Sequence, residues 1–215
     1  MQSSITTIFF DLFGVLLGID QSVVVQYLSN LTGLPYLKTR EVAMGEPFMR
    51  LERGEINFTQ YTDEIRATLP NGNRIEADAL RDIWMNSKVG EMPAVSLLEK
   101  LQPGCEGWII SNTTESHIKS LQSKFTFFDF VSGIITSERA GAHKPNQKIF
   151  QFALSEANTN AASSMFIDDS HANVKSAEDL GIVSHHYNEF DGLMAFLDPV
   201  CNFNQGLFPS CLSIL

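Results

Sequence analysis

A series of short apolar runs recurs along the chain, and segments with helical periodicity lie between them. The runs are rich in β-branched and aromatic residues, which is typical of strands buried on both faces of a sheet. They lie at Ile5 to Phe10, Trp108–Ile110, Gly133–Thr136, Met165–Ile167 and Ile182–Val183. Alternation of such strands with helices predicts a parallel sheet with right-handed crossovers.

Three segments between the later runs carry apolar residues at helical spacing. Their apolar positions are Leu97, Leu98 and Leu101 after Pro93; Ile149, Phe150, Ala153 and Leu154; and Val174, Ala177 and Leu180 before a stop at Gly181. Glycine after the last periodic residue is a common helix end. We therefore predict an α/β fold with a Rossmann-like parallel sheet core and helices on both faces.

The stretch from residue 19 to residue 90 breaks this alternation and predicts several helices without a convincing strand. One helical stripe carries Val24, Tyr27, Leu28 and Leu31, and another carries Tyr61, Ile65 and Leu69. Asn57 and Gln60 stand at capping-box spacing before the second stripe. We predict a core of residues 1–18 and 91–215, with a small α-helical cap of residues 19–90 inserted after the first strand.

Charge and composition limit the partners. The net charge is −10 at pH 7 without a basic run, which argues against nucleic acid and membrane partners. An acidic surface also repels phosphate esters, so a phosphate site must supply its own positive charge. The 44% apolar residues are typical of a globular protein.

The N-terminal sequence and the cysteines both favour a protein of a reducing compartment. The apolar stretch from Ile8 to Leu17 is interrupted by Asp11 and has no basic region before it, unlike a secretory signal. Three cysteines without metal-binding spacing, at positions 105, 201 and 211, are expected to be idle thiols. We expect a cytoplasmic protein.

Polar residues follow the predicted strands, where ligands bind in open α/β sheets. Asp11 follows the first strand, although a turn carboxylate before Gly14 is an equally good interpretation of this residue alone. Ser111 and Asn112 follow the second. Taken alone they are better interpreted as helix caps, but their hydroxyl, amide and backbone N–H groups also suit an anion.

A lysine and a pair of carboxylates follow later strands. A lone lysine is usually a solvated charge, but Pro145 disfavours helix at Lys144 and holds it extended. Asp168 and Asp169 repel each other unless a cation or donor lies between them. The pair is therefore the strongest single signal for a bound metal. Asn173 lies on the helix that follows.

Together these side chains are expected to converge on one crevice. Such a set suits phosphoryl transfer, because Mg²⁺ and a lysine neutralise phosphate oxygens, polar donors orient them and a carboxylate attacks in line. The predicted partner is a small phosphorylated metabolite.

The sequence resembles the haloacid dehalogenase superfamily over nearly the whole chain. The motifs that carry the resemblance are FFDLFGV, IISNT, KPNQKIF and FIDDSHANVKSA. The helical insertion resembles the small cap that follows the first motif. Within it, Met44 to Ile56 is similar to the cap of bacterial phosphatases that release glucose from glucose 1-phosphate. The phosphatase domain of soluble epoxide hydrolases is a further relative.

The resemblance implies a magnesium site and a nucleophile. It makes Asp11 both the nucleophile, which forms an aspartyl-phosphate, and a metal ligand. The backbone carbonyl of Phe13 is a further implied ligand. Asp169 is expected to bind the metal, with Asp168 supporting it or replacing it.

The resemblance also implies a phosphate site. Ser111 and Asn112 are expected to hold the phosphate, and Lys144 to pair with both Asp11 and the phosphate. Asn173 either orients the acidic loop or is a helix-surface amide.

One position departs from the pattern. Most phosphatases of the superfamily carry a second Asp two residues after the nucleophile, which protonates the leaving oxygen and later activates water; here it is Phe13. Loss of a general acid or base typically costs ~10²–10⁴ in rate. Candidates for a substitute acid are His171, His143, Asp20, Glu52 and Glu55, and the sequence does not rank them.

The leading hypothesis is a Mg²⁺-dependent phosphatase of small phosphomonoesters, sugar phosphates among them. A 2-haloacid dehalogenase is the enzymatic alternative, favoured by an aromatic residue at Phe13 and opposed by the acidic pair. In that case Arg40 is a candidate for holding the substrate carboxylate. A catalytically silent binding protein is the third reading, and it rests on Phe13 alone.

The end of the chain from Asp198 to Leu215 is apolar, without helical or strand periodicity. We expect it to pack against the core or a partner subunit. A monomer and a homodimer are both compatible with the sequence.

Overall fold

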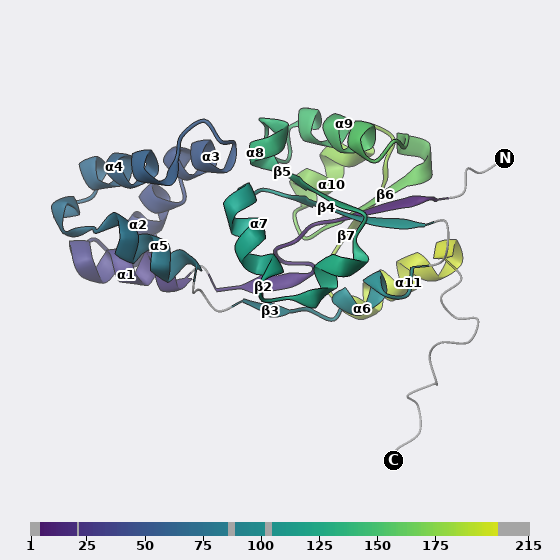
Figure 1. Ribbon diagram of the computed structural model, residues 1–215, viewed down its shortest axis with the longest axis horizontal. Helices are drawn as coiled ribbons and strands as arrows, with labels where there is room; N and C mark the ends of the chain where they lie inside the picture. Colours follow the sequence, from purple (N-terminus) through teal and green to yellow (C-terminus); the bar gives the residue numbers. More distant parts are fainter. Residues whose placement is uncertain (1–4, 21, 86–88, 102–104, 202–215) are drawn as a thin grey trace, which may run out of the picture.

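The core is a parallel five-stranded sheet. The computed structural model describes residues 5–20, 22–85, 89–101 and 105–201 (Figure 1). In spatial order β5-β4-β1-β6-β7, the strands are β5 (Gly133–Thr136), β4 (Glu106–Ser111), β1 (Thr7–Phe10), β6 (Ser164–Asp168) and β7 (Val183–His186). All neighbouring pairs are parallel. Each predicted run overlaps one of these strands, so the predicted α/β fold is confirmed.

Helices cover both faces of the sheet because its strands alternate apolar side chains between two cores. In β1, Ile8 and Phe10 join one core and Phe9 joins the other. The first core is completed by α6 (Val95–Leu98), α7 (Glu115–Gln122) and α11 (Phe190–Cys201). The second is completed by α8 (Ser137–Ala140), α9 (Gln147–Glu156) and α10 (His171–Glu178), which lie on the opposite side in Figure 1. This arrangement buries β1 completely and fixes the position of the residue that follows it.

Five helices form a separate layer beside the core, which we call the cap (Figure 1). They are α1 (Ser22–Thr32), α2 (Tyr36–Ala43), α3 (Glu46–Glu52), α4 (Phe58–Thr68) and α5 (Ala77–Met85), with a 3₁₀ turn η1 (Gly72–Arg74). Their buried side chains form a third apolar cluster. The capping box predicted at Asn57 and Gln60 is present at the start of α4. The exact limits 19–90 of the cap stay a prediction.

An antiparallel ribbon joins the cap to the core, and the sequence did not indicate it. Its strands are β2 (Leu17–Ile19) and β3 (Val89–Glu91). Three residues are too few to display a period, so pairing partners far apart in the chain decide this element. The helix expected to reach Leu101 also differs, since α6 ends at Leu98 and the following N–H groups bond three residues back. The remaining 3₁₀ turns are η2 (Thr126–Phe130) and η3 (Ala161–Ser163).

The packing expected of residues 198–215 stays a prediction. Helix α11 continues through residues 198–201, although no helical period was recognised there. Residues 202–215, with Cys211, lie outside the described residues. None of the described helices has the length and apolar character that a bilayer crossing requires. The cytoplasmic location and the oligomeric state stay predictions.

One buried hydrogen bond joins two cap helices and provides a stability test. The hydroxyl of Tyr61 in α4 is buried and donates to the carbonyl of Ala43 at the end of α2 (2.9 Å). Tyr61→Phe is expected to keep the ring packing but leave that carbonyl unsatisfied, at a cost of about 1–3 kcal/mol. Urea denaturation monitored by circular dichroism measures the change. An unchanged midpoint would show that this bond does not stabilise the cap.

Candidate active site

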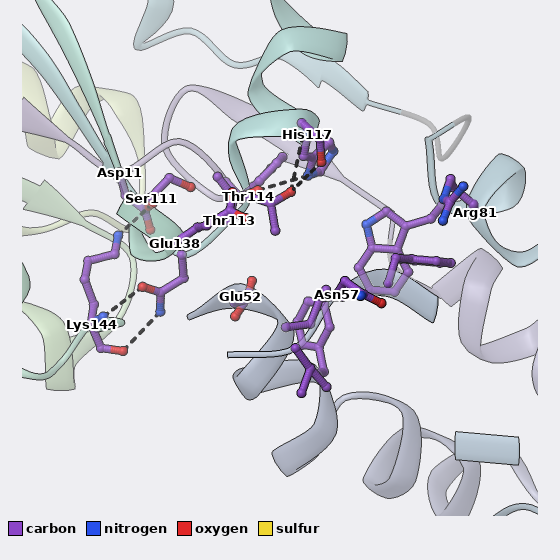
Figure 2. A pocket seen from close by; sticks show the side chains of 18 of the residues that line it. Asp11, Glu52, Asn57, Arg81, Ser111, Thr113, Thr114, His117, Glu138 and Lys144 are labelled. Carbon is purple, nitrogen blue, oxygen red and sulfur yellow. Dashed lines mark hydrogen bonds and ion pairs between the residues drawn. The ribbon is translucent and has the colours of Figure 1, made fainter. Parts of the chain in front are cut away.

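A pocket of about 670 Å³ lies at the carboxyl ends of β1 and β4, between the core and the cap. The core contributes a polar end to this pocket, and the cap contributes mainly apolar and aromatic side chains (Figure 2). Of the residues predicted for the site, the lining includes Asp11, Phe13, Ser111, Asn112, Lys144 and Asn173. The pocket thus brings together Asp11, which follows β1, and Asn173, which lies 162 positions later on α10; ligands bind at this edge of open α/β sheets.

Asp11 extends the ladder of β1 by one residue. Its N–H donates to the carbonyl of Ile167 (2.8 Å), which places its side chain at the edge of the sheet. One carboxylate oxygen, Oδ1, accepts from Nζ of Lys144 (2.7 Å) and from the N–H of Leu12 (2.6 Å). Burial raises the pKa of Asp11, and Lys144 opposes that effect by stabilising the ionised form. The carboxylate is therefore held by the core and reaches the pocket.

Lys144 is the central cation of the site. Its buried Nζ contacts Asp11, Asp168 (Oδ2, 2.6 Å) and the carbonyl of Ile110 (2.9 Å). Burial alone lowers the pKa of a lysine, but the two carboxylates outweigh it and raise the pKa of Lys144 above its ordinary value. The ammonium stays charged at neutral pH. This is the local positive charge that the acidic chain needs for binding an anion.

Asn112 fixes the backbone of Lys144 with a pair of hydrogen bonds. Its amide nitrogen donates to the Lys144 carbonyl (3.0 Å), and its amide oxygen accepts from the Lys144 N–H (2.8 Å). Figure 2 shows both bonds. The amide of Asn112 thus positions the lysine, which sequence reasoning did not foresee.

The two adjacent aspartates occupy different environments. Asp168 is fully buried, and its Oδ1 accepts from Asn173 (2.9 Å) and the N–H of Ser170 (2.8 Å) while its Oδ2 faces Lys144. Asn173 therefore orients the acidic loop. Asp169 is exposed and lies against Gly14, where an added Cβ would be 2.2 Å from its Oδ2. Both oxygens of Asp168 are engaged, whereas Asp169 keeps a carboxylate available for a ligand.

The carboxylates of Asp11, Asp168 and Asp169 form a group that suits a divalent cation. Each offers one oxygen, and these oxygens lie within 4.8 Å of one another. Like charges at such distances repel, and Lys144 contacts only Asp11 and Asp168 among the three. A hard cation such as Mg²⁺ prefers oxygen ligands of this kind. The residues present therefore fit the predicted metal.

Ser111 presents a hydroxyl without a protein partner. It is fully buried, lines the pocket, and its Oγ has no hydrogen bond to any of the described residues. A buried polar group without a partner costs about 1–3 kcal/mol. The hydroxyl is therefore positioned to bind a ligand oxygen.

Phe13, which occupies the position of the second Asp of most phosphatases in the superfamily, lines the pocket. Its ring stacks on His117 at a centroid distance of 5.4 Å. Burial, helped by Lys124, lowers the pKa of His117 to about 4, so this imidazole is neutral at physiological pH. Neither ring supplies an acidic proton there.

Of the five candidates for a substitute acid, Glu52 alone lines the described pocket. Figure 2 shows its side chain between the end with Asp11 and Lys144 and the aromatic end beside Asn57. Burial, opposed by Lys144 and assisted by Asp11, raises the pKa of Glu52 to about 8. This shift favours the protonated form of Glu52 at neutral pH.

The other four candidates lie elsewhere. Glu55 is exposed and paired with Arg53 (2.6 Å). Asp20 is exposed and accepts from the N–H of Ser22 (3.0 Å). His171 and His143 do not line the pocket.

The cap loop after Glu52 is fastened to the core. The hydroxyl of Ser137 in α8 accepts from the N–H of Thr113 (3.0 Å) and donates to the carbonyl of Glu52. Gly54 has a φ of +69°, and a Cβ there would be 2.8 Å from Cγ of Glu138. These contacts hold α3 against the core and keep the side chain of Glu52 in the pocket. The sequence did not indicate that Ser137 makes these hydrogen bonds.

Residues 5–181 match the haloacid dehalogenase-like hydrolase family. The chain is 25% identical over 194 residues to D-ribitol-5-phosphate phosphatase of Bacteroides thetaiotaomicron, covering 82% of this chain and 89% of that protein. It is 28% identical over 95 residues to sesquiterpene phosphatase astK of Aspergillus oryzae, covering 44% of this chain and 48%, about half, of that relative.

A HAD family enzyme from Bacteroides thetaiotaomicron, solved with magnesium and inorganic phosphate, has a similar fold. The TM-score is 0.72 at 24% identity, covering 88% of this chain and 99% of that one. The family match extends over most of the 215 residues and includes every strand end described above except that of β7. The chain therefore belongs to the haloacid dehalogenase-like hydrolase family.

Proposed function

We propose that this hydrolase is a Mg²⁺-dependent phosphatase of small phosphomonoesters with Asp11 as the nucleophile. The observation that carries the proposal is the buried Lys144, which joins Asp11 and Asp168 at the polar end of the pocket. The hydroxyl of Ser111, which has no hydrogen-bond partner among the described residues, lines the same pocket. A phosphatase among the relatives and a structural neighbour solved with magnesium and phosphate support it.

Each side chain at the polar end has a proposed role. Asp11, Asp169 and the Phe13 carbonyl would hold Mg²⁺, with Asp168 supporting the site through Lys144. When bound, the ion supplies charge that neutralises phosphate oxygens. The Ser111 hydroxyl and the backbone N–H of Asn112 would bind the remaining phosphate oxygens, and the charge of the Lys144 ammonium would help to neutralise them.

The proposed reaction has two displacements at phosphorus. A carboxylate oxygen of Asp11 attacks the phosphorus, the bond to the ester oxygen breaks, and an aspartyl-phosphate forms. The departing oxygen keeps the bonding electron pair and needs a proton. Water then attacks the same phosphorus, loses a proton to a base, and releases phosphate and the Asp11 carboxylate.

Glu52 is proposed as the group that moves both protons. It enters the pocket from the cap, opposite the core residues that would hold the phosphate, and the Ser137 bond fixes its backbone. Its raised pKa provides the proton for the leaving alcohol at neutral pH, and the resulting carboxylate can activate water. A cap carboxylate would then replace the acid that Phe13 lacks.

The other two readings of the sequence find less support. The dehalogenase reading needs a cation for a substrate carboxylate, and Arg40 is exposed on α2 and does not line the pocket. The hypothesis of a catalytically silent binding protein rested on the absence of an acidic residue at Phe13, and Glu52 offers a replacement for that acid. Sugar phosphates were favoured by the cap similarity, and D-ribitol 5-phosphate is the named substrate of one relative.

The proposal predicts strict dependence on a divalent cation. Purified protein with millimolar Mg²⁺ is expected to hydrolyse p-nitrophenyl phosphate, and a chelator should abolish this activity until Mg²⁺ is restored. Asp169→Asn is expected to raise the Mg²⁺ concentration for half-maximal rate by about 10–100-fold. Asp129→Asn, an exposed substitution outside the pocket, is the control. Full hydrolysis in excess chelator would refute a metal-dependent mechanism.

A further inference from the structure

The end of the pocket away from Lys144 is apolar. Its wall comprises Phe48, Leu51, Ile56, Phe58 and Trp84 from the cap, with Phe13 from the core. The rings of Phe48 and Trp84 pack at a centroid distance of 5.0 Å. Four of these residues stand on cap helices: Phe48 and Leu51 on α3, Phe58 on α4 and Trp84 on α5.

Several polar side chains near this end already have partners. The Asn57 side-chain oxygen accepts from the N–H of Gln60 (2.9 Å) in the capping box. Thr114 accepts from the N–H of His117 (3.3 Å). Hydroxyl groups of a bound polyol would lose water against this largely apolar wall, and each unmatched hydroxyl weakens binding.

The charges of the pocket also limit the substrate. Of its described lining residues, Lys144 and Arg81 are cations. Lys144 belongs to the phosphate end, and Arg81 lies over the ring of Phe58 (4.9 Å) and near Asp78 (3.6 Å). A second anionic group on the substrate would therefore find Arg81 as the one further cation among these described residues, beside the ring of Phe58.

We infer that the substrate is the monophosphate ester of an uncharged, hydrophobic alcohol. This inference rests on the proposed phosphatase function and names the substrate class of the same site. The polar end takes the phosphate, and the organic group lies against Phe48, Phe58 and Trp84. A pocket of about 670 Å³ leaves room for such a group, since ligand pockets of this size hold drug-sized molecules.

A chain-length series tests the inference with matched leaving groups. Ethyl, butyl and octyl monophosphate are all esters of primary alcohols, as is D-ribitol 5-phosphate. Burial of each added methylene is expected to raise kcat/KM about threefold to fourfold. Octyl phosphate should then exceed ethyl phosphate by at least about a hundredfold, with D-ribitol 5-phosphate at or below ethyl phosphate.

Substitutions in the wall locate the effect. Trp84→Gln is expected to lower kcat/KM for octyl phosphate by about tenfold or more, and to lower kcat/KM for ethyl phosphate by a smaller factor, because the shorter chain buries less apolar surface. Trp84→Phe should retain most of the preference. Phe58→Ser, on a different helix, provides a second variant if Trp84→Gln does not fold. Melting temperatures verify that the variants are folded.

The possible outcomes separate the two proposals. A flat chain-length series, faster turnover of D-ribitol 5-phosphate, or an unaffected Trp84→Gln would overturn the hydrophobic substrate while leaving the phosphatase intact. If no ester is hydrolysed, the phosphatase proposal fails. Isothermal titration calorimetry with Mg²⁺ then compares the affinities of octylphosphonate and ethylphosphonate for the pocket. Equal affinities would overturn the inference of a hydrophobic substrate.

Discussion

Asp11→Asn is expected to lower kcat for phosphomonoester hydrolysis by at least about 10³-fold, because an amide oxygen is a poor nucleophile. The substitution is nearly isosteric. Lys144 keeps its contact with Asp168 (2.6 Å), so the buried ammonium retains a carboxylate partner. Steady-state hydrolysis of p-nitrophenyl phosphate with saturating Mg²⁺ measures the effect.

Two measurements make this result specific for a covalent nucleophile. Asp129→Asn changes the same functional group at an exposed position and should retain full activity. In the wild type, borohydride reduction during turnover should convert the acyl phosphate at position 11 to homoserine, detected by mass spectrometry. Equal turnover by wild type and Asp11→Asn would exclude Asp11 as the nucleophile.

The polar end of the pocket was predictable because parallel strands align their carboxyl ends. Asp11 follows β1 directly, and Ser111 and Asp168 are the last residues of β4 and β6, so strand recognition was sufficient to place them together. Lys144 lies further from its strand, and Pro145 was the only local reason to select it. For these residues, a position at the carboxyl end of a predicted strand was enough to predict a place in the site.

Individual roles within that end were less predictable. Asn112 was expected to hold the phosphate, and its side-chain amide bonds the backbone of Lys144, which leaves only its backbone N–H for that proposed role. The choice between Asp168 and Asp169 depended on which one the lysine and Asn173 engage. Such pairings depend on distances of a few tenths of an ångström, which spacing in the sequence does not encode.

The cap wall could not be predicted for a different reason. Phe48 and Trp84 stand on α3 and α5, and both look like ordinary apolar residues of amphipathic helices. Whether such a residue joins the cap core or lines the pocket depends on how the cap lies on the sheet. That placement is set by tertiary contacts, such as Ser137 with Glu52 and Gly54 against Glu138. For this reason the sequence could not rank Glu52 above the four other candidates for the substitute acid.

Glu52→Gln is expected to lower kcat for an alkyl monophosphate by about 10²–10⁴-fold, because the variant cannot protonate the leaving alkoxide. An aryl ester with a good leaving group needs no such proton. With p-nitrophenyl phosphate, the variant should release one equivalent of nitrophenolate in a burst and then stall, since hydrolysis of the aspartyl-phosphate lacks its base. Rapid-mix absorbance measurements detect the burst.

Glu55→Gln is the matched control, because it changes the same group three residues later, where the side chain faces Arg53 rather than the pocket. It should leave both substrates within about twofold of wild type. An unchanged kcat for the alkyl ester in Glu52→Gln would assign the proton to another group.

Stability should respond to Glu52→Gln in the opposite direction from activity. The folded state holds the Glu52 proton up to about pH 8, whereas the unfolded state releases it near the ordinary glutamate pKa of 4.5. Between these values the unfolded state binds fewer protons, so the contribution of Glu52 to stability falls as the pH rises. Glutamine carries no such penalty, and the variant should melt a few °C higher than wild type at about pH 8.5 and gain less at about pH 5. A side chain with a merely structural role would lose stability on substitution, so a lower melting temperature at high pH would contradict a buried, protonated Glu52.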